Sequence, residues 1–293
     1  MPGVDIYRGT SNIALPAEVS EEIWGSAVDQ SFFMQASRQI RIPGTGTTIQ
    51  VIASDPEADW VDETAPKPVD TATFAKKVLT PYKLAVIEPF SNEFRRDLPG
   101  LYEELVRRLP GALAKKFDQT ILGSTAPGSN FSVLGSAPTQ GIAGDTFAGF
   151  AAADYAIADN AGGMMNYIGL DPMGRSLVLG ATDQSGRPLF IPDATEGTVG
   201  RILGAPVMVN RNLGVTGTPA VVGIAGDFTN AVWGSVEGIK IAVSDQATLV
   251  SNNTPLPLWQ MNMFGVRCEI EVAFAVRDVN DFVLLTDDEA TSA

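Results

Sequence analysis

The amino-acid sequence predicts an α+β fold with long excursions from its core. One stretch, 98–123, places large apolar residues at helical spacing, and the final third contains several stretches that are typical of β-strands. The 293 residues include 29 glycines and 19 prolines, about a sixth of the chain, which indicates many turns and long loops. Hydrophobic residues make up 45% of the sequence, enough for a substantial core.

The first thirty residues predict an arm that ends in a helix. Residues 1–15 contain few core-forming side chains and are expected to be extended. A helix is expected from Pro16, because acidic residues follow at once, where they interact favourably with the helix dipole. Apolar residues then recur at helical spacing: Val19, Ile23, Trp24, Ala27 and Val28. The chain after this helix is expected to be extended through Ile40 and Ile42.

Two strand-like stretches, 47–53 and 72–91, predict an extended hairpin. Between them, 55–70 contains six acidic residues, three prolines and a single base, Lys67. A two-stranded hairpin of this composition cannot supply its own core, which suggests that it rests on another surface. A solvated surface loop is an equally open interpretation. Trp60, in the acidic tip, is slightly favoured as an anchor against such a surface.

The stretch 98–123 is the clearest helix. Its apolar residues recur every four positions: Leu101, Leu105, Leu109, Leu113, Phe117 and Ile121. Glu103 and Glu104 lie early, Lys115 and Lys116 lie late, and Gly123 is placed to end the helix. Pro110 is expected to kink or split it.

The remaining chain alternates loops, helices and strands. Residues 124–145 are expected to form a loop, 147–161 a helix, and 165–179 a strand followed by a turn and a short helix. A strand closed by a turn is expected at 203–214. Further strands are expected at 220–228, 231–244, 263–278 and 281–287. Within 263–278, Val266, Cys268 and Ile270 alternate with charged residues, which predicts a half-buried strand.

Composition excludes several classes of chemistry. The sequence has no histidine, so Ser-His-Asp catalysis and histidine metal sites are excluded. The one cysteine, Cys268, cannot form an intrachain disulfide and is expected to be a buried hydrophobic residue. No phosphate-binding glycine motif occurs, and the acidic residues of 55–63 lack the spacing of a calcium loop. We therefore expect no catalytic residue, no metal and no cofactor.

The charge and hydropathy of the sequence indicate which partners the protein binds and where in the cell it is found. The net charge of −14 disfavours tight binding to nucleic acid. No apolar run approaches the length of a membrane helix and the N-terminus has no signal-peptide pattern, so a soluble cytoplasmic product is expected. Nine bases and five acids lie between Lys76 and Phe117, whereas the preceding tip is acidic. This segregation weakly favours pairing between molecules, although an ordinary polar helix face explains any single residue.

An ordered series of segments resembles the major capsid proteins of tailed phages, which have the Hong Kong 97-type fold. The series covers roughly residues 16–287 and includes 60–64 (WVDET), 83–85 (KLA), 89–97 (PFSNEFRRD), the long helix with Ala114 and Asp118, and the Leu122–Gly123 pair that closes it. It continues with 203–207 (LGAPV), 226–228 (GDF), 267–278 and 281–283 (DFV).

The resemblance implies a division of the chain. Residues 1–30 would form the N-arm, 47–87 the extended E-loop hairpin, and 31–46 and 88–127 parts of a peripheral domain with a long spine helix. Residues 128–227 would form the axial domain, 228–277 the returning strands of the peripheral domain, and 278–293 an axial-domain strand and the C-terminal tail.

The resemblance also implies a function: a non-enzymatic major capsid protein that assembles into hexamers and pentamers of an icosahedral head. The head would enclose double-stranded DNA without sequence-specific binding, and would be assembled in the host bacterial cytoplasm. A separate scaffolding protein, a portal and optional decoration proteins would be its partners. The expected contacts between subunits are Trp24, Asp55, Glu57, Asp59, Trp60, Asp62, Glu63, Lys67, Arg95, Arg96, Arg107 and Arg108.

Alternatives remain at this point. An encapsulin-type nanocompartment that encloses a protein cargo would share the shell fold. A carboxylate-dependent hydrolase is a more distant reading. Some relatives join a lysine to an asparagine between subunits, and Lys67, Lys76 and Lys77 lie on the hairpin. No partner asparagine was identified, so non-covalent closure of the shell is expected.

Overall fold

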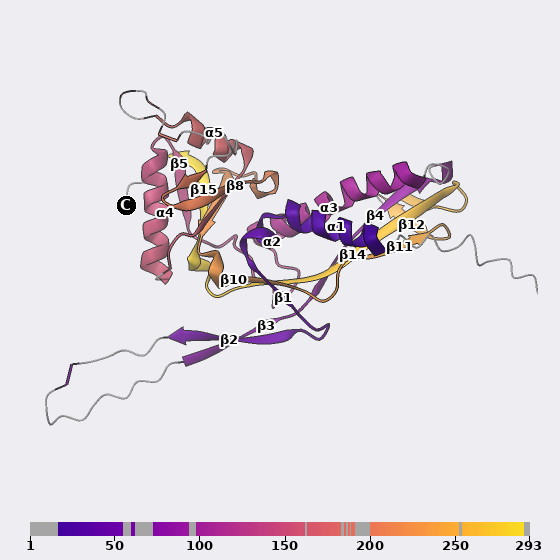
Figure 1. The fold of residues 1–293 in the computed structure, drawn as a ribbon, viewed down its shortest axis with the longest axis horizontal. Helices are drawn as coiled ribbons and strands as arrows, with labels where there is room; N and C mark the ends of the chain where they lie inside the picture. Colours follow the sequence, from indigo (N-terminus) through magenta and orange to yellow (C-terminus); the bar gives the residue numbers. More distant parts are fainter. Residues whose placement is uncertain are drawn as a thin grey trace, which may run out of the picture.

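A long strand, β14 (Met263–Val276), organises the first of two lobes in the computed structural model (Figure 1). It pairs on one side with β4 (Tyr82–Ser91) and on the other with β10 (Ala231–Ser235) and β11 (Lys240–Ser244), all antiparallel. The short strand β1 (Arg38–Arg41) runs parallel to β10 at the edge of this five-stranded sheet. The structure describes residues 17–54, 60–61, 73–93, 98–161, 163–182, 185, 187, 189–190, 200–251 and 254–289.

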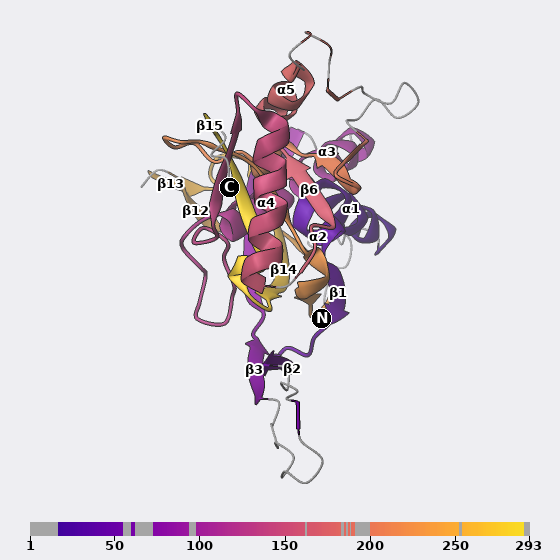
Figure 2. The ribbon, with the colours of Figure 1, turned by 90° about the vertical axis from the view of Figure 1, so that its left-hand side faces the viewer.

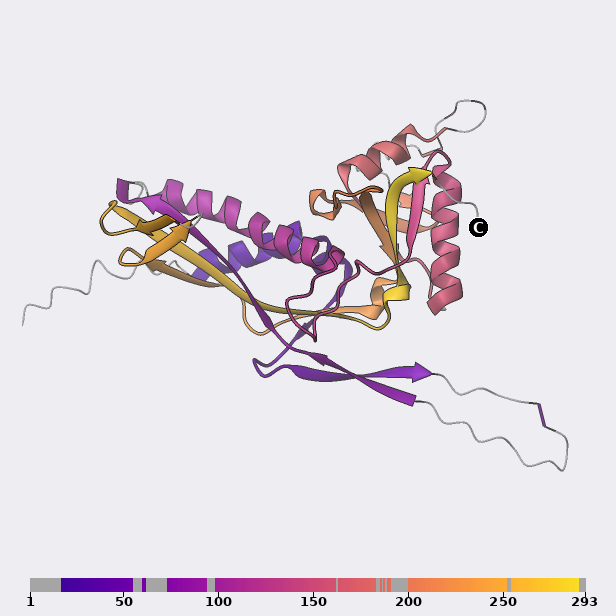
Figure 3. The same ribbon diagram turned by 180° about the vertical axis from the view of Figure 1, so that it is seen from behind.

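Helices cover one face of this sheet, with α3 (Leu98–Leu122) lying along it and α1 (Ala17–Gln30) beside α3 (Figure 3). The short helix α2 (Phe32–Ala36) follows α1 directly. Phe117 of α3 packs edge-on against Phe274 of β14, with ring centroids 6.2 Å apart. Alternate residues of β14 point into this core, because the side chains of a strand alternate between its two faces.

The second lobe is a six-stranded mixed sheet in the order β5 (Thr139–Ala143), β15 (Phe282–Glu289), β9 (Val221–Gly226), β6 (Tyr167–Leu170), β8 (Ala205–Val209) and β7 (Arg201–Ile202). Helix α4 (Thr146–Ala161) lies across its outer face, and α5 (Pro172–Gly180) lies at one end (Figure 2). The core between them contains Phe150, Ile157 and Ile168. Three 3₁₀ helices, η2 (Arg211–Leu213), η3 (Phe228–Asn230) and η4 (Val279–Asp281), connect its strands to other elements.

Two hairpins extend from this body. β2 (Thr47–Ser54) and β3 (Thr73–Leu79) pair with each other and form a separate ribbon below the body, which runs toward the side of the second lobe (Figures 1 and 3). The base of this hairpin is packed on the body: Leu79 is buried with Ala273 and Ala275 of β14, and the Lys77 ammonium donates to the Val276 carbonyl. The second hairpin, β12 (Thr248–Ser251) and β13 (Thr254–Pro257), lies at the far end of the first lobe (Figure 1).

Most expected elements are confirmed, including the helix after Pro16, the long helix 98–123, the helix 147–161 and the half-buried strand at 263–278. Helix α3 continues through Pro110 without a break, so the expected split does not occur. The stretch 72–91 is two strands rather than one. Pro81, which lacks an N–H donor, lies between them, and residues 82–87 pair with β14 and not within the hairpin.

Other elements differ from the expectation. Residues 231–244 also form two strands, β10 and β11, separated by a turn at Glu237 and Gly238. Strand β5 occupies part of the expected loop 124–145, and α2 interrupts the expected extended segment. The arm 1–15 and the tip 55–70, apart from Trp60 and Val61, lie outside the described residues. Among the helices that the structure describes, none is long and apolar enough to cross a membrane.

Candidate assembly surfaces

Trp60 is the most exposed large apolar side chain among the described residues, with a relative accessibility of 104%. Its neighbour Val61 is also exposed. They lie in the segment that joins β2 to β3, whereas the described contacts of the hairpin with the body are at its base. An exposed indole beside a valine is an apolar surface that a neighbouring molecule could cover.

Trp24 has a different environment. It is half-buried on α1 and packs against Trp233 of β10, with ring centroids 6.0 Å apart and planes inclined by 51°. The Trp233 indole N–H donates to the Met34 carbonyl at 3.0 Å, so both α1 and α2 are attached to the first lobe through this ring. Trp24 therefore holds the arm helix to its own subunit, and its contact with a neighbour stays a prediction.

Asp118, on the buried side of α3, connects three parts of the chain. Its carboxylate accepts hydrogen bonds from the Ser31 hydroxyl (2.6 Å), the Phe32 and Phe33 amides (3.1 and 3.4 Å) and the Asn212 side-chain amide (3.2 Å). The first three donors form the beginning of α2, and Asn212 belongs to η2 of the second lobe. One carboxylate thus joins α3, α2 and the second lobe.

The electrostatics of Asp118 follow from its burial. The side chain is fully buried, and the loss of hydration raises its pKa to about 6, although the four donors oppose this rise. The sequence contains a signal for this residue, because Asp118 follows Phe117 and lies next to the apolar stripe of α3. An acid in that position must be paired or hydrogen-bonded when the helix packs.

The basic residues expected at subunit contacts are only partly described. Arg108 lies on α3, is exposed, and forms an ion pair with Glu88 of β4 at 3.4 Å. Arg107 precedes it on the same helix. The other charged residues of the expected contacts lie outside the described residues: Asp55, Glu57, Asp59, Asp62, Glu63, Lys67, Arg95 and Arg96. The pairing of the acidic tip with these bases stays a prediction.

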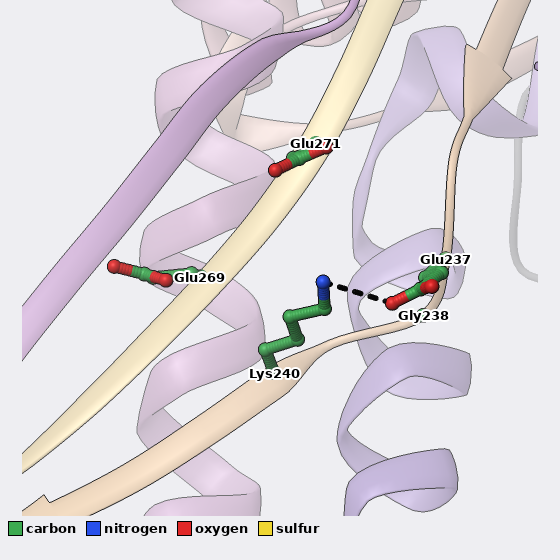
Figure 4. A pocket seen from close by; sticks show the side chains of 5 residues that line it. All are labelled: Glu237, Gly238, Lys240, Glu269 and Glu271. Atoms are coloured by element: carbon green, nitrogen blue, oxygen red, sulfur yellow. Dashed lines mark ion pairs between the residues drawn. The ribbon is translucent and has the colours of Figure 1, made fainter. Parts of the chain in front are cut away.

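The uncovered face of the first-lobe sheet carries a charged cluster (Figure 4). Lys240 pairs with Glu237 at 2.9 Å, and this pairing lowers the pKa of Glu237 and raises that of Lys240. Glu271 pairs with Lys83 at 3.4 Å on the neighbouring strand. These pairs face solvent, where an ion pair contributes little to stability. The shallow depression between them is lined by charged side chains of mixed sign and is too small for a substrate.

The described residues offer little catalytic chemistry. No group of three or more histidine, cysteine, aspartate or glutamate side chains among them is placed to hold a metal ion. Cys268 is fully buried on β14, as its alternating pattern predicts, and burial with the nearby Glu269 charge raises its pKa to about 12. Such a thiol is inert at neutral pH, because the thiolate is the reactive form.

Comparisons with known proteins agree with this picture. The model of the Phage capsid family matches residues 12–287. The probable major capsid protein gp17 of Mycobacterium phage L5 is 32% identical over 301 residues, covering 95% of this chain and 91% of that protein. Its counterpart in Mycobacterium phage D29 is 31% identical and covers 93% and 90%.

Solved structures share the fold. A chain from Mycobacterium phage Ogopogo superposes with a TM-score of 0.70 at 18% identity, covering 88% of this chain and 92% of that one. A chain from Gordonia phage Cozz gives 0.69 at 21% identity, covering 88% and 86%. The chain therefore belongs to the phage capsid family and has the Hong Kong 97-type fold of tailed-phage major capsid proteins.

Proposed function

We propose that this major capsid protein assembles into hexamers and pentamers that close into the icosahedral head of a tailed double-stranded DNA phage. The observation that carries the proposal is the projecting β2–β3 hairpin, whose Trp60 has no cover within the described chain. Such an element gains a packed environment only from another molecule. A shell supplies that molecule at every position.

The two surfaces that form the expected contact between subunits are chemically different. The hairpin tip supplies Trp60 and acidic residues, and α3 with the segment before it supplies Arg95, Arg96, Arg107 and Arg108. An interface between unlike surfaces is head-to-tail, and it generates a ring when the rotation closes. Rings of five and six subunits are the units from which an icosahedral shell is built.

The acidic charge suits the enclosed genome. With a formal charge of −14, the subunit does not attract DNA by counterion release, so packaged DNA remains free to move. We place assembly in the host bacterial cytoplasm, with a portal, a separate scaffolding protein and optional decoration proteins as partners. Closure of the shell without a covalent link, and the division of the chain into N-arm, E-loop, peripheral and axial domains, belong to the same proposal.

An encapsulin-type shell is not favoured, because the matching family and the curated relatives are phage capsid proteins. The fold alone would not separate the two. Nothing in the described residues points to catalysis as the main activity of the chain.

Electron microscopy of the purified chain tests the proposal, together with size-exclusion chromatography. We expect capsomer rings or closed polyhedral shells, either alone or after co-expression with the neighbouring phage genes. A chain that stays monomeric at every concentration and with each of these partners would refute the shell function.

A further inference from the structure

Two of the chain crossings between the lobes are hydrogen-bonded to each other. One crossing joins β14 to β15 through η4, and the other joins β9 to β10 through η3. The Arg277 amide of the first crossing donates to the Asn230 carbonyl of the second at 3.0 Å. The Asp227 amide of the second crossing donates to the Asp281 carbonyl of the first, also at 3.0 Å. The placement of one lobe relative to the other therefore depends on how these two crossings pack.

The base of the projecting hairpin meets these crossings at Lys77 of β3. Its ammonium donates to the carbonyl of Val276, the last residue of β14. The side chain is half-buried in a cleft of about 50 Å³ between the hairpin and the body. The other lining residues of this cleft are Ile49, Leu79, Asn230, Val232, Ala275, Val276 and Arg277. One residue of each crossing, Asn230 and Arg277, is among them, so Lys77 lies where the hairpin and both crossings come together.

The charge of Lys77 is held at this point against the cost of its burial. Burial lowers the pKa of Lys77 from its ordinary value, and the negative charges of Asp278 and Asp281 oppose this effect. Asp281 is already paired with the Arg277 guanidinium at 3.0 Å, which leaves Asp278 as the stronger influence on the ammonium. An apolar side chain of similar volume would fill the cleft without the dehydration of a charge. Stability of the fold therefore does not account for a lysine at this position.

We propose that Lys77 is a positioning residue, which couples the direction of the β2–β3 hairpin to the placement of the two lobes. The stem of Lys77 moves with β3, whereas its ammonium is held by the end of β14 and by the charge of Asp278 in the crossing to the second lobe. A shift of the second lobe moves η4 and with it this charge, so the hairpin turns with the lobes. The inference concerns a single subunit and does not depend on the proposed shell function.

Distances between two spin labels, measured by pulsed electron paramagnetic resonance on the full-length unassembled chain, test this coupling. Cys268 is fully buried, so introduced thiols are labelled against little background. Gln50→Cys, exposed on β2, and Ala158→Cys, exposed on α4, report the direction of the hairpin relative to the second lobe. Lys77→Met removes the charge and the donor. Lys76→Met is the matched control, because Lys76 is exposed on the same strand and does not line the cleft.

We expect Lys77→Met to broaden the distribution of label distances at least twofold and to change Tm by less than about 3 °C. Lys76→Met should leave both quantities as they are in the parent chain. A distribution that stays narrow in Lys77→Met, or that is already broad in the parent, would overturn the proposal. A larger fall in Tm with an unchanged distribution would assign Lys77 to stability alone, which also overturns it.

A second variant tests the part assigned to Asp278. This side chain caps η4 by accepting from the Asn280 amide at 3.0 Å, and asparagine accepts the same bond without the charge. Asp278→Asn should broaden the distance distribution when Lys77 is present and have no further effect in the Lys77→Met background, because its charge acts through the ammonium. Equal broadening in both backgrounds, or none in either, would contradict the coupling.

Discussion

Replacing Asp118 by alanine is expected to destabilise the subunit more than any other single change of a charged residue that the structure describes. The change leaves the Ser31 hydroxyl, the Phe32 and Phe33 amides and the Asn212 amide without their acceptor. Each buried donor left unpaired costs about 1–3 kcal/mol, and water or rotation of the hydroxyl offsets part of the sum. We therefore expect a loss of about 3–5 kcal/mol at pH 7, comparable to breaking a buried ion pair.

Thermal unfolding of unassembled subunits measures this loss. For a chain of this size, the expected fall in Tm is roughly 6–10 °C. Asp159→Ala is the matched control, because Asp159 is exposed on α4 and its removal should change Tm by less than about 1 °C. A fall for Asp118→Ala no larger than that of the control would refute the reasoning.

The pH dependence gives an independent check on Asp118. Its pKa is raised to about 6 in the folded chain from an ordinary 3.8, so between these values the folded state retains a proton that the unfolded state has released. The stability contributed by this group is therefore fully present below pH 3.8 and is lost as the pH rises through 6. The difference in free energy of unfolding between wild type and Asp118→Ala should narrow by about 1 kcal/mol between pH 5 and pH 7.5. A gap that widens over this range would show that burial does not dominate.

Three further outcomes follow from the environments of single side chains. Trp24→Ala removes a half-buried ring from its contact with Trp233 and should lower the free energy of unfolding by about 2–3 kcal/mol, measured by urea denaturation. Trp60→Ala should leave the Tm of the isolated subunit unchanged, because the ring is fully exposed, yet reduce assembly in electron micrographs. Cys268 should not react with maleimide in the folded chain at pH 8 and should react at once in urea, because burial raises its pKa to about 12. Rapid labelling of the folded chain would mean that β14 opens.

The sequence predicts best the helices and strands whose buried side chains recur with a single period. The stripe through Leu109, Leu113 and Phe117 and the alternation of β14 each point one set of side chains at a core, and both elements lie where they were expected. The points at which a strand-like stretch divides into two strands are harder to predict from the sequence. Pro81 separates two strands with different partners, whereas the turn at Gly238 separates two strands that pair with successive parts of β14, and pairing partners are not encoded locally.

The candidate surfaces were predictable only where exposure follows from composition. Trp60 within an acidic, proline-rich tip is one such case. The surface at the junction of the lobes was not predictable, because Ser37, Tyr167 and Phe228 come from three distant segments and meet only when both lobes are folded. The helix α2 was missed for a related reason: its first turn is capped by Asp118, which lies 87 residues after Ser31.

The Asp118 hydrogen bonds and the ring contacts of Phe32 could not be predicted from the sequence, and both lie at the junction of the two lobes. Asp118 joins α3 and α2 to Asn212 of the second lobe, and Phe32, directly after Ser31, packs on Tyr167 and Phe228. Packed cores shift between discrete arrangements and do not deform continuously. The Asp118 hydrogen bonds and the ring contacts of Phe32 therefore both fix the placement of the lobes relative to each other. Asp118→Ala should therefore loosen this junction as well as destabilise the fold. Hydrogen exchange of the Phe32 and Phe33 amides, which donate to Asp118, should then be faster in Asp118→Ala than in the wild type, at a temperature where the subunit remains folded.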